Sequence, residues 1–345
     1  MATIGPTLET AEDLRQAIGA GARWFRFPCG YRERPHVEDA RAVRAAAAQA
    51  GAIVQLLLDL PSSRPRTGIM QELRPAVGEH VLFWDSEALA SPPNPNRAPA
   101  VPLPGLKELL AKLAPNHEMW FCDGRLRFTV DEIHGSSVLA RMVQGTLPLK
   151  SSNSLFLPDS PSAFRVITPP DRALLQAFAA AKLLPEWIAL SLIASPRDVR
   201  LGRRAAREIL GQDIRVMAKF ETLAAVQCAE EIIRESDGIM VARGDLGLAV
   251  GYVGLPEVQD RLVAAARKAG KVAVVATQVL EVFAETGLPQ RSELSDLSLI
   301  ARQQAHAVML GKETVYSPRP IECIRLAREV LTHETRRFAA EARPH

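Results

Sequence analysis

The sequence of 345 residues contains few cysteines and no long apolar run. Its four cysteines, Cys29, Cys122, Cys228 and Cys323, are far apart and form no CxxC pair, so we expect reduced, buried thiols rather than a disulfide framework or a zinc site. No stretch approaches the roughly 18 consecutive apolar residues that cross a bilayer, and the N-terminus lacks the basic and apolar regions of a secretory signal. We therefore expect no membrane association and a cytoplasmic location.

The sequence also lacks an excess of either sign of charge. Lys and Arg number 42 and Asp and Glu number 39, and the two signs are interspersed, so no basic stripe for a nucleic acid is present. Only eight of the basic residues are Lys, which makes a lysine at a special position informative. The hydrophobic fraction of 47% and the charged fraction of 23% exclude a disordered chain, and the length suits about two domains.

Short apolar segments alternate with helical patterns through most of the chain. The expected strands, each typical of a strand buried on both faces, are Ala2–Ile4, Ala22–Phe27, Ala52–Leu58, Trp187–Ser191, Ile214–Lys219, Gly238–Ala242, Val272–Ala276 and Ala307–Leu310. The expected helices include Ala11–Ile18, Val37–Ala50, Ser195–Leu210, Leu223–Arg234 and Pro256–Ala269. This α/β order predicts a closed (β/α)8 barrel, a TIM barrel. The alternative is an open Rossmann-like sheet, but no GxGxxG follows an early strand.

One long interval interrupts this alternation, between the third and fourth expected strands. It contains six prolines within residues 92–104, which exclude a helix interior or a central strand there. Around them lie short β-like pieces, at His80–Trp84, Glu118–Phe121 and Leu126–Val130. We therefore expect a small β-rich domain inserted after strand three. The expected boundaries are 69–159 for this domain and 1–68 with 160–345 for the barrel.

In such barrels the active site lies at the carboxyl ends of the strands. The polar residues at the expected strand ends are Arg26, Asp59, Ser191, Lys219, Glu221, Arg243, Gly244, Asp245, Thr277 and Glu313. The basic side chains among them favour an anionic substrate, such as a phosphate or a carboxylate. Glu221 and Asp245 end neighbouring strands, and two carboxylates with open positions suit a hard divalent ion such as Mg²⁺. The alternative is a surface Glu and an Asp that caps a helix.

Several motifs, in chain order, resemble those of the pyruvate kinase family. They are Thr3–Pro6 (T-I-G-P), Arg66–Gly68 (R-T-G), Ala218–Glu221 (A-K-F-E, for the family's A-K-I-E), Ser236–Gly247 (the metal and substrate loop), Ala276–Glu281 (A-T-Q-V-L-E, for A-T-Q-M-L-E) and Arg291–Asp296 (R-S-E-L-S-D, for R-A-E-V-S-D). The resemblance spans the chain and includes the insertion point. It implies a phosphotransferase that converts phosphoenolpyruvate and ADP into pyruvate and ATP with Mg²⁺ or Mn²⁺, and an inserted domain that acts as a mobile lid.

The resemblance also implies a role for individual residues. Lys219 would contact the transferring phosphoryl group, Arg26 would bind the phosphate, and Thr277 would lie near the carbon that gains a proton. Glu221 and Asp245 would hold the metal. The carboxylate of the substrate would meet Arg243, Gly244 and Asp245, with Ser191 and Thr277 as further substrate-binding residues. Arg66 and Lys150 would meet the nucleotide phosphates.

The monovalent-cation site departs from the family pattern. The family's N-F-S-H aligns with Pro28–Tyr31, which removes two oxygen ligands for K⁺. Asp59 is kept, but the Thr and Glu of K⁺-dependent members become Leu60 and Arg64. Because K⁺-independent members resemble this pattern, we expect Arg64 with Asp59 to replace the K⁺ ion, so that K⁺ is not required. The alternative is a drifted site at which Arg64 faces solvent.

Other departures leave the reaction open. The family's S-F-V-R ends in Ala194 here, so one active-site arginine is lost, and a serine of the proposed proton path becomes Gly311. The family's C-terminal regulatory domain is absent, so we expect no control by a sugar phosphate, and a homodimer through the barrel. The alternatives are a paralogue that keeps the Mg²⁺–enolate core but uses another acceptor or 2-oxo acid lyase chemistry, and a non-catalytic ligand-binding regulator.

Overall fold

The computed structural model describes residues 1–29, 36–94, 96–122, 124–158 and 165–341, and divides the chain into two compact units. The barrel unit is Met1–Pro61 with Val166–His345, and the β unit is Ser62–Arg165. From the sequence, the boundaries are expected at 68/69 and 159/160, and the second of these lies outside the described residues.

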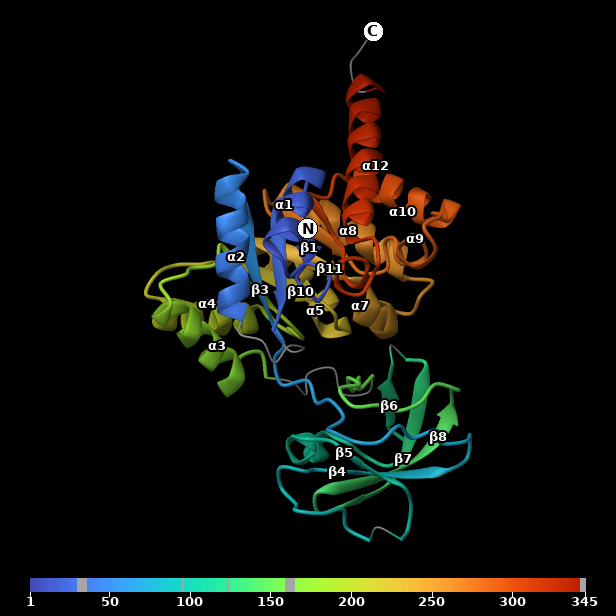
Figure 1. The fold of residues 1–345 in the computed structure, drawn as a ribbon. Helices are drawn as coiled ribbons and strands as arrows, with labels where there is room; N and C mark the ends of the chain where they lie inside the picture. Colours follow the sequence, from blue (N-terminus) through green and yellow to red (C-terminus); the bar gives the residue numbers. More distant parts are fainter. Residues whose placement is uncertain (30–35, 95, 123, 159–164, 342–345) are drawn as a thin grey trace. The chain divides into compact units, whose positions relative to one another are not determined.

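The barrel unit is built on eight parallel strands (Figure 1). They are β1 (Ala2–Thr3), β2 (Trp24–Pro28), β3 (Gln55–Leu60), β9 (Trp187–Leu190), β10 (Arg215–Phe220), β11 (Gly238–Ala242), β12 (Val272–Ala276) and β13 (Ala307–Met309). Each strand pairs with the next in this order, and a parallel bridge between Ala2 and Leu310 joins the last strand to the first. The predicted closed barrel is therefore confirmed.

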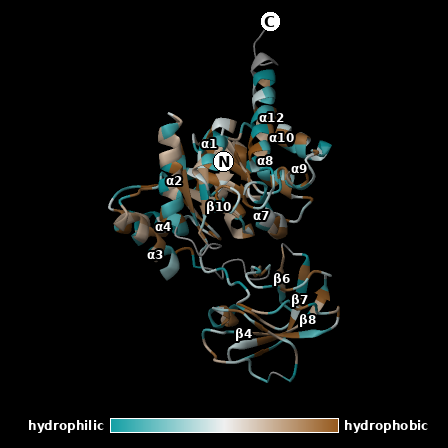
Figure 2. Cartoon of the chain, in the orientation of Figure 1, coloured by the Kyte–Doolittle hydropathy of each residue, from teal (hydrophilic) through white to brown (hydrophobic). Residues whose placement is uncertain are grey.

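Helices surround the strands of this unit (Figure 1). They are α1 (Ala11–Ala20), α2 (His36–Gln49), α3 (Pro169–Ala180), α4 (Pro196–Leu210), α5 (Leu223–Gln227), α6 (Ala229–Glu235), α7 (Arg243–Val250), α8 (Leu255–Lys268), α9 (Glu281–Thr286), α10 (Arg291–Arg302), α11 (Lys312–Val315) and α12 (Pro320–Glu341). Figure 2 shows hydrophilic residues along the visible face of α12. Among the described residues, no helix is both long enough and apolar enough to span a bilayer.

The prediction of a single helix over Leu223–Arg234 is wrong. The chain forms two short helices, α5 and α6, which meet at Cys228. Cys228 has a ψ of 28°, outside the helical range, and its N–H still bonds to the carbonyl of Ala224. Neither Gly nor Pro marks this break, so the sequence pattern does not predict it.

The predicted burial of the four cysteines is only partly correct. All four lie within the described residues, and none of them forms a disulfide. Cys323 is buried, whereas Cys29, Cys122 and Cys228 are half-buried.

Strand alternation divides the residues of the barrel between two cores. On β10, Ala218 and Phe220 belong to the large core between the strands and the helices. Met217 belongs to a smaller core with side chains such as Trp187 and Met240, contributed by neighbouring strands. Because successive side chains on a strand point to opposite faces, Lys219 lies on the same side as Met217. This alternation places a charged residue at the interior end of a strand.

The β unit contains a five-stranded sheet with its own core. The strand order is β5 (Ala100–Pro102), β4 (His80–Trp84), β8 (Ser137–Gln144), β7 (Leu126–His134) and β6 (Glu118–Phe121), and two 3₁₀ turns, Leu106–Glu108 and Leu110–Lys112, precede β6. Phe83, Phe121 and Phe128 pack together with ring centroids 5.2–5.9 Å apart. Pro102 lies on the edge strand β5, as expected for a residue without a backbone donor.

Candidate active site

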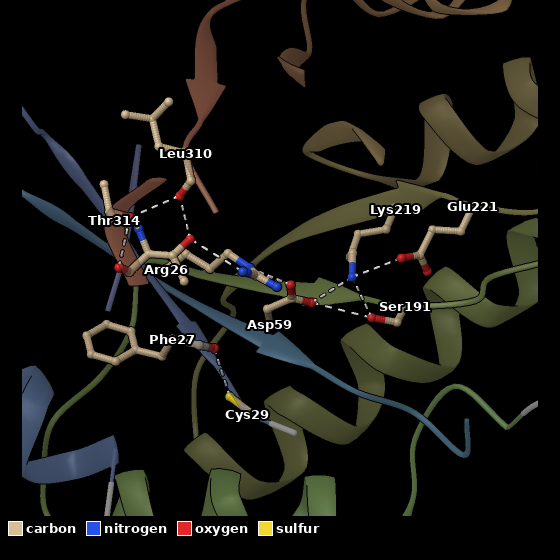
Figure 3. Close-up of polar contacts among 10 residues, drawn as sticks. Arg26, Phe27, Cys29, Asp59, Ser191, Lys219, Glu221, Leu310 and Thr314 are labelled. Carbon is tan, nitrogen blue, oxygen red and sulfur yellow. Dashed lines mark hydrogen bonds and ion pairs between the residues drawn. The ribbon is translucent and has the colours of Figure 1, made fainter. Parts of the chain in front are cut away.

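The carboxyl ends of β2, β3, β9 and β10 bring five polar side chains together (Figure 3). Asp59 follows Leu57 by two residues on β3, as Lys219 follows Met217 on β10, so both face the barrel interior. The strand register pairs Asp59 with Ala189 and Arg26 with Leu57. The four strands therefore end at neighbouring positions, which explains why residues distant in sequence meet here.

Lys219 is the centre of this group. Its Nζ lies 3.0 Å from Asp59 Oδ1 and 3.1 Å from Glu221 Oε1, and donates a hydrogen bond of 2.8 Å to Ser191 Oγ. The side chain of Lys219 is only 10% exposed, and those of Asp59 and Glu221 are 3% and 4% exposed. The ammonium group is thus held in one place by three oxygen atoms.

The neighbouring charges keep both Lys219 and Asp59 ionised. Burial by itself lowers the pKa of Lys219, but the carboxylates of Asp59 and Glu221 outweigh it and raise that pKa above the ordinary value. Burial by itself raises the pKa of Asp59, but Lys219 and Arg26 outweigh it and lower that pKa. Arg26, Lys219, Asp59 and Glu221 thus carry two positive and two negative charges near neutral pH, which cancel.

Arg26 links this group to the junction between the first and last strands of the barrel. Its Nε donates to Asp59 Oδ2 at 2.7 Å, and its Nη1 donates to Thr3 Oγ1 at 3.3 Å. Thr3 in turn donates to the carbonyl of Leu310 at 2.7 Å, and its N–H donates to Thr314 Oγ1 at 2.9 Å. The threonines that join the first strand to the end of the last one therefore also orient Arg26.

Glu221 has oxygen atoms suited to a divalent ion. Its Oε1 forms an ion pair with Lys219, and its Oε2 accepts a hydrogen bond from the N–H of Leu192 at 2.7 Å. Each carboxylate oxygen has two lone pairs, so acceptor capacity remains on both. Asp245, the other expected ligand, is half-buried in the first turn of α7. Within the described part of the chain, no group of three His, Cys, Asp or Glu residues forms a metal cage.

The guanidinium of Arg243 is held by the loop that follows β12 and by Asp296. Its Nε and Nη2 donate to the carbonyl of Thr277 at 3.1 and 2.6 Å, and Nη2 also donates to the carbonyl of Gln278 at 2.9 Å. Its Nη1 lies 2.7 Å from both carboxylate oxygens of Asp296. Each of its three nitrogens already has a partner on the protein. A contact between Arg243 and the substrate carboxylate stays a prediction.

Thr277 and Gly244 are brought together at the ends of β12 and β11. The N–H of Gly244 donates to Thr277 Oγ1 at 3.2 Å. Thr277 and the following Gln278 have φ angles of 73° and 53°, in the left-handed region. For residues other than glycine such a conformation costs about 1–3 kcal/mol each, and it persists only where the surroundings enforce it.

The residues predicted to meet the nucleotide and to replace K⁺ belong largely to the β unit. Arg66 Nη1 donates to the carbonyl of Ser152 at 3.2 Å, and Lys150 Nζ forms an ion pair of 3.1 Å with Glu72. Arg64 is half-buried in the same unit. Asp59 belongs to the barrel unit, and its pairing with Arg64 stays a prediction. Gly30 and Tyr31 of the altered cation motif lie outside the described residues.

Two functional contacts were not predicted from the sequence. Thr3 orients Arg26, and Asp296 orients Arg243. Both residues lie in motifs that carry the family resemblance, T-I-G-P and R-S-E-L-S-D, so the motifs gave a sign of their importance. Their partners are far away in sequence, and no local pattern identifies them.

Comparison with known proteins agrees with this fold and these motifs. The family model described as pyruvate kinase, barrel domain, matches residues 1–324. A pyruvate kinase of Methylorubrum extorquens is 34% identical over 327 residues, which are 94% of this chain and 66% of that protein. A pyruvate kinase of Agrobacterium vitis is 29% identical over 334 residues, which are 96% of this chain and 68% of that protein. The crystal structure of a pyruvate kinase from Cryptosporidium parvum has a TM-score of 0.82 at 25% identity, covering 96% of this chain and 68% of that one.

Proposed function

Because the chain belongs to the pyruvate kinase family, we propose that it transfers the phosphoryl group of phosphoenolpyruvate to ADP, giving pyruvate and ATP. The chain spans about two thirds of the length of the relatives it matches, 66% for the first of them. The observation that carries the proposal is the buried ammonium of Lys219, held at the strand ends between Asp59, Glu221 and Ser191. A fixed cation at this position stabilises the charge on a phosphoryl group in transit.

The charge balance of the site calls for a divalent ion with the substrate. The charges of Arg26 and Lys219 are cancelled by those of Asp59 and Glu221, so an incoming phosphate brings uncompensated negative charge. Glu221 and Asp245 would supply the hard oxygen ligands that Mg²⁺ prefers. When bound, the ion neutralises charge on the phosphoryl and enolate oxygens. The proposed cofactor is therefore Mg²⁺ or Mn²⁺.

Proton delivery to the methylene carbon is assigned to Thr277. Its Oγ1 accepts from the Gly244 N–H, so its own hydroxyl hydrogen is available for donation. The enolate that remains after phosphoryl transfer needs one proton to become pyruvate. Thr277 would pass its hydroxyl proton to the carbon and regain one from water. Lys219 stabilises the enolate oxygen while the carbon is protonated. Gly311 replaces the family's serine in this path, so Thr277 is the hydroxyl that we expect to act.

The nucleotide phosphates are assigned to Arg66 and Lys150. The side chain of Lys150 is 58% exposed, and its partner Glu72 is 39% exposed. Such an exposed ion pair contributes only about 0–1 kcal/mol, so a phosphate can displace Glu72 at low cost. Lys150 is therefore available to an anionic ligand despite its ion pair.

Independence from K⁺ is supported by the surroundings of Asp59. Oδ1 of Asp59 forms an ion pair with Lys219 and accepts a hydrogen bond from Ser191, and Oδ2 accepts one from Arg26. Pro28 and Leu60, at two other positions of the family's cation site, carry no side-chain oxygen. A carboxylate already neutralised by fixed cations has little affinity for K⁺. Arg64 is proposed to add further positive charge.

The test is pyruvate release from phosphoenolpyruvate with Mg²⁺ and ADP, comparing the wild type with Lys219→Met. The control is Lys271→Met, because the Nζ of Lys271 donates to the carbonyl of Ser236 at 2.6 Å and makes no contact with the site residues above. We expect turnover in the wild type and in the control, and a loss of at least about 10³-fold in Lys219→Met. Circular dichroism checks that each variant is folded. A silent wild type, or full turnover of Lys219→Met, would contradict the proposal. Release without ADP dependence would indicate another acceptor.

A further inference from the structure

The dipeptide Thr277–Gln278, which follows β12, is held in its left-handed conformation from two sides. On one side, Arg243 donates three hydrogen bonds to the carbonyls of Thr277 and Gln278. Asp296 fixes the guanidinium from behind through both of its oxygens. A threonine is branched at Cβ and rarely adopts a positive φ, so this conformation needs such support.

On the other side, the two residues that follow Gln278 donate hydrogen bonds to a buried carboxylate. Glu313, on α11, is fully buried. Its Oε1 accepts the N–H groups of Val279 and Leu280, each at 3.0 Å, and its Oε2 accepts the N–H of Gly311 at 2.7 Å. One side chain therefore joins the loop after β12 to the loop after β13. Nothing in the proposed reaction accounts for a carboxylate at this place.

We propose that Glu313 is a positioning residue for Thr277. Glu313 fixes the N–H groups that follow the dipeptide Thr277–Gln278, while Arg243 fixes its carbonyl groups. The dipeptide then has no freedom to relax to a right-handed or extended backbone. This keeps Thr277 Oγ1 at the N–H of Gly244 and its hydroxyl hydrogen free for the substrate. The inference rests on the proposed function, since it concerns the residue assigned to proton delivery.

Glu313→Gln tests this directly, because it keeps the shape of the side chain. Three backbone N–H groups occupy the two oxygens of Glu313. A glutamine amide has one oxygen and one NH₂ group, so its NH₂ must face at least one backbone N–H. The hydrogen bonds to one loop are then lost, and the segment gains freedom to move. A displacement of about 1 Å at a reacting group lowers kcat by about 10²-fold, which is the loss we expect.

A double-mutant cycle with Thr277→Ala separates positioning from general destabilisation. We expect Glu313→Gln to lower kcat about 10²-fold in the wild type but less than about 3-fold in the Thr277→Ala background, because its effect passes through Thr277. Equal losses in the two backgrounds would overturn the proposal. If Glu313→Gln does not fold, Arg243→Lys, which weakens the opposite side of the same dipeptide, replaces it in the cycle, and again equal losses would overturn it.

Glu293→Gln is the matched control. Glu293 also accepts three backbone N–H groups, from Val282, Phe283 and Gln290, but none from residues 277–280. We expect it to lower the melting temperature and to leave kcat within about 2-fold, since it acts only on the fold. A loss of kcat as large as that of Glu313→Gln would refute a specific role for Glu313. A wild type without turnover would instead contradict the proposed function, so the two failures are distinguishable.

Discussion

Replacing Asp59 with Asn removes one charge from the centre of the buried network without changing the shape of the side chain. The two oxygens of Asp59 receive Lys219, Ser191 and Arg26 at 2.7–3.4 Å. In Asp59→Asn an NH₂ group must face either the ammonium of Lys219 or the guanidinium of Arg26. One cation loses its partner, and Glu221 is the one carboxylate that remains among these contacts beside the buried Lys219 and the half-buried Arg26.

The expected loss of stability is large. Removing one partner of a buried ion pair costs about 3–5 kcal/mol, because an uncompensated charge stays buried. For a unit of this size, about 2–4 °C of melting temperature corresponds to 1 kcal/mol, so we expect a decrease of about 6–20 °C. The basic limb of the activity profile moves to lower pH as well. The cause is that burial lowers the pKa of Lys219 once the Asp59 charge that opposes it is gone.

The assay is thermal unfolding of the wild type, Asp59→Asn and Glu208→Gln, followed by circular dichroism. Glu208→Gln is the control, because it also replaces a carboxylate by an amide in the barrel unit. Its partner is the exposed Arg204, at 2.8 Å, and such a pair contributes only about 0.3–0.5 kcal/mol. If Asp59→Asn melts within about 2 °C of this control, the argument that the buried charges hold this end of the barrel together is wrong.

Three further predictions concern cations, acid and packing. Replacing K⁺ by tetramethylammonium should leave kcat unchanged. Strict K⁺ dependence, measured as pyruvate release, would refute the proposal that Arg64 with Asp59 replaces the K⁺ ion. The pKa of Asp59 is lowered in the folded chain, so its contribution to stability is present above about pH 4 and is lost as the pH falls through its folded-state pKa. The melting temperature of the wild type should therefore fall more steeply below pH 4 than that of Asp59→Asn, and parallel curves would contradict this assignment. Gly5→Ala would place a Cβ atom 2.7–2.9 Å from Val315, including its Cα, and should cost about 1–3 kcal/mol. Gly19→Ala, which meets nothing within 4 Å, should be neutral or stabilising; equal melting temperatures would disprove the clash.

Most of the barrel was predictable because its strands are buried on both faces. Such strands appear as continuous short apolar runs, and β11 and β12 have the bounds expected from the sequence. The break at Cys228 was not predictable, because the helical pattern continues through it without Gly or Pro. In the β unit, β4 and β6 match their predicted ranges, whereas β8, Ser137–Gln144, was missed. Its first four residues are buried, so it does not show the strict alternation that identifies a half-buried strand.

The site was predictable as far as strand direction determines it. Lys219 and Asp59 lie two residues after interior apolar residues, so the period of a strand aims them inward. The orientation of Arg243 was not predictable in this way. Its partners Thr277 and Asp296 come from later elements, and a long side chain at the start of a helix can reach the substrate or the neighbouring loop equally well. Only the folded arrangement distinguishes these two directions.

The measurement that tests the central claim most directly is the ratio of ATP to pyruvate formed from phosphoenolpyruvate and ADP. Phosphorus NMR follows the loss of the phosphoenolpyruvate signal and the growth of the ATP signal, while pyruvate is measured in the same sample. With Mg²⁺ and without K⁺, we predict one ATP for each pyruvate in the wild type and neither product in Lys219→Met. Pyruvate without ATP, or no pyruvate at all, would contradict the assignment of this chain as a phosphotransferase to ADP.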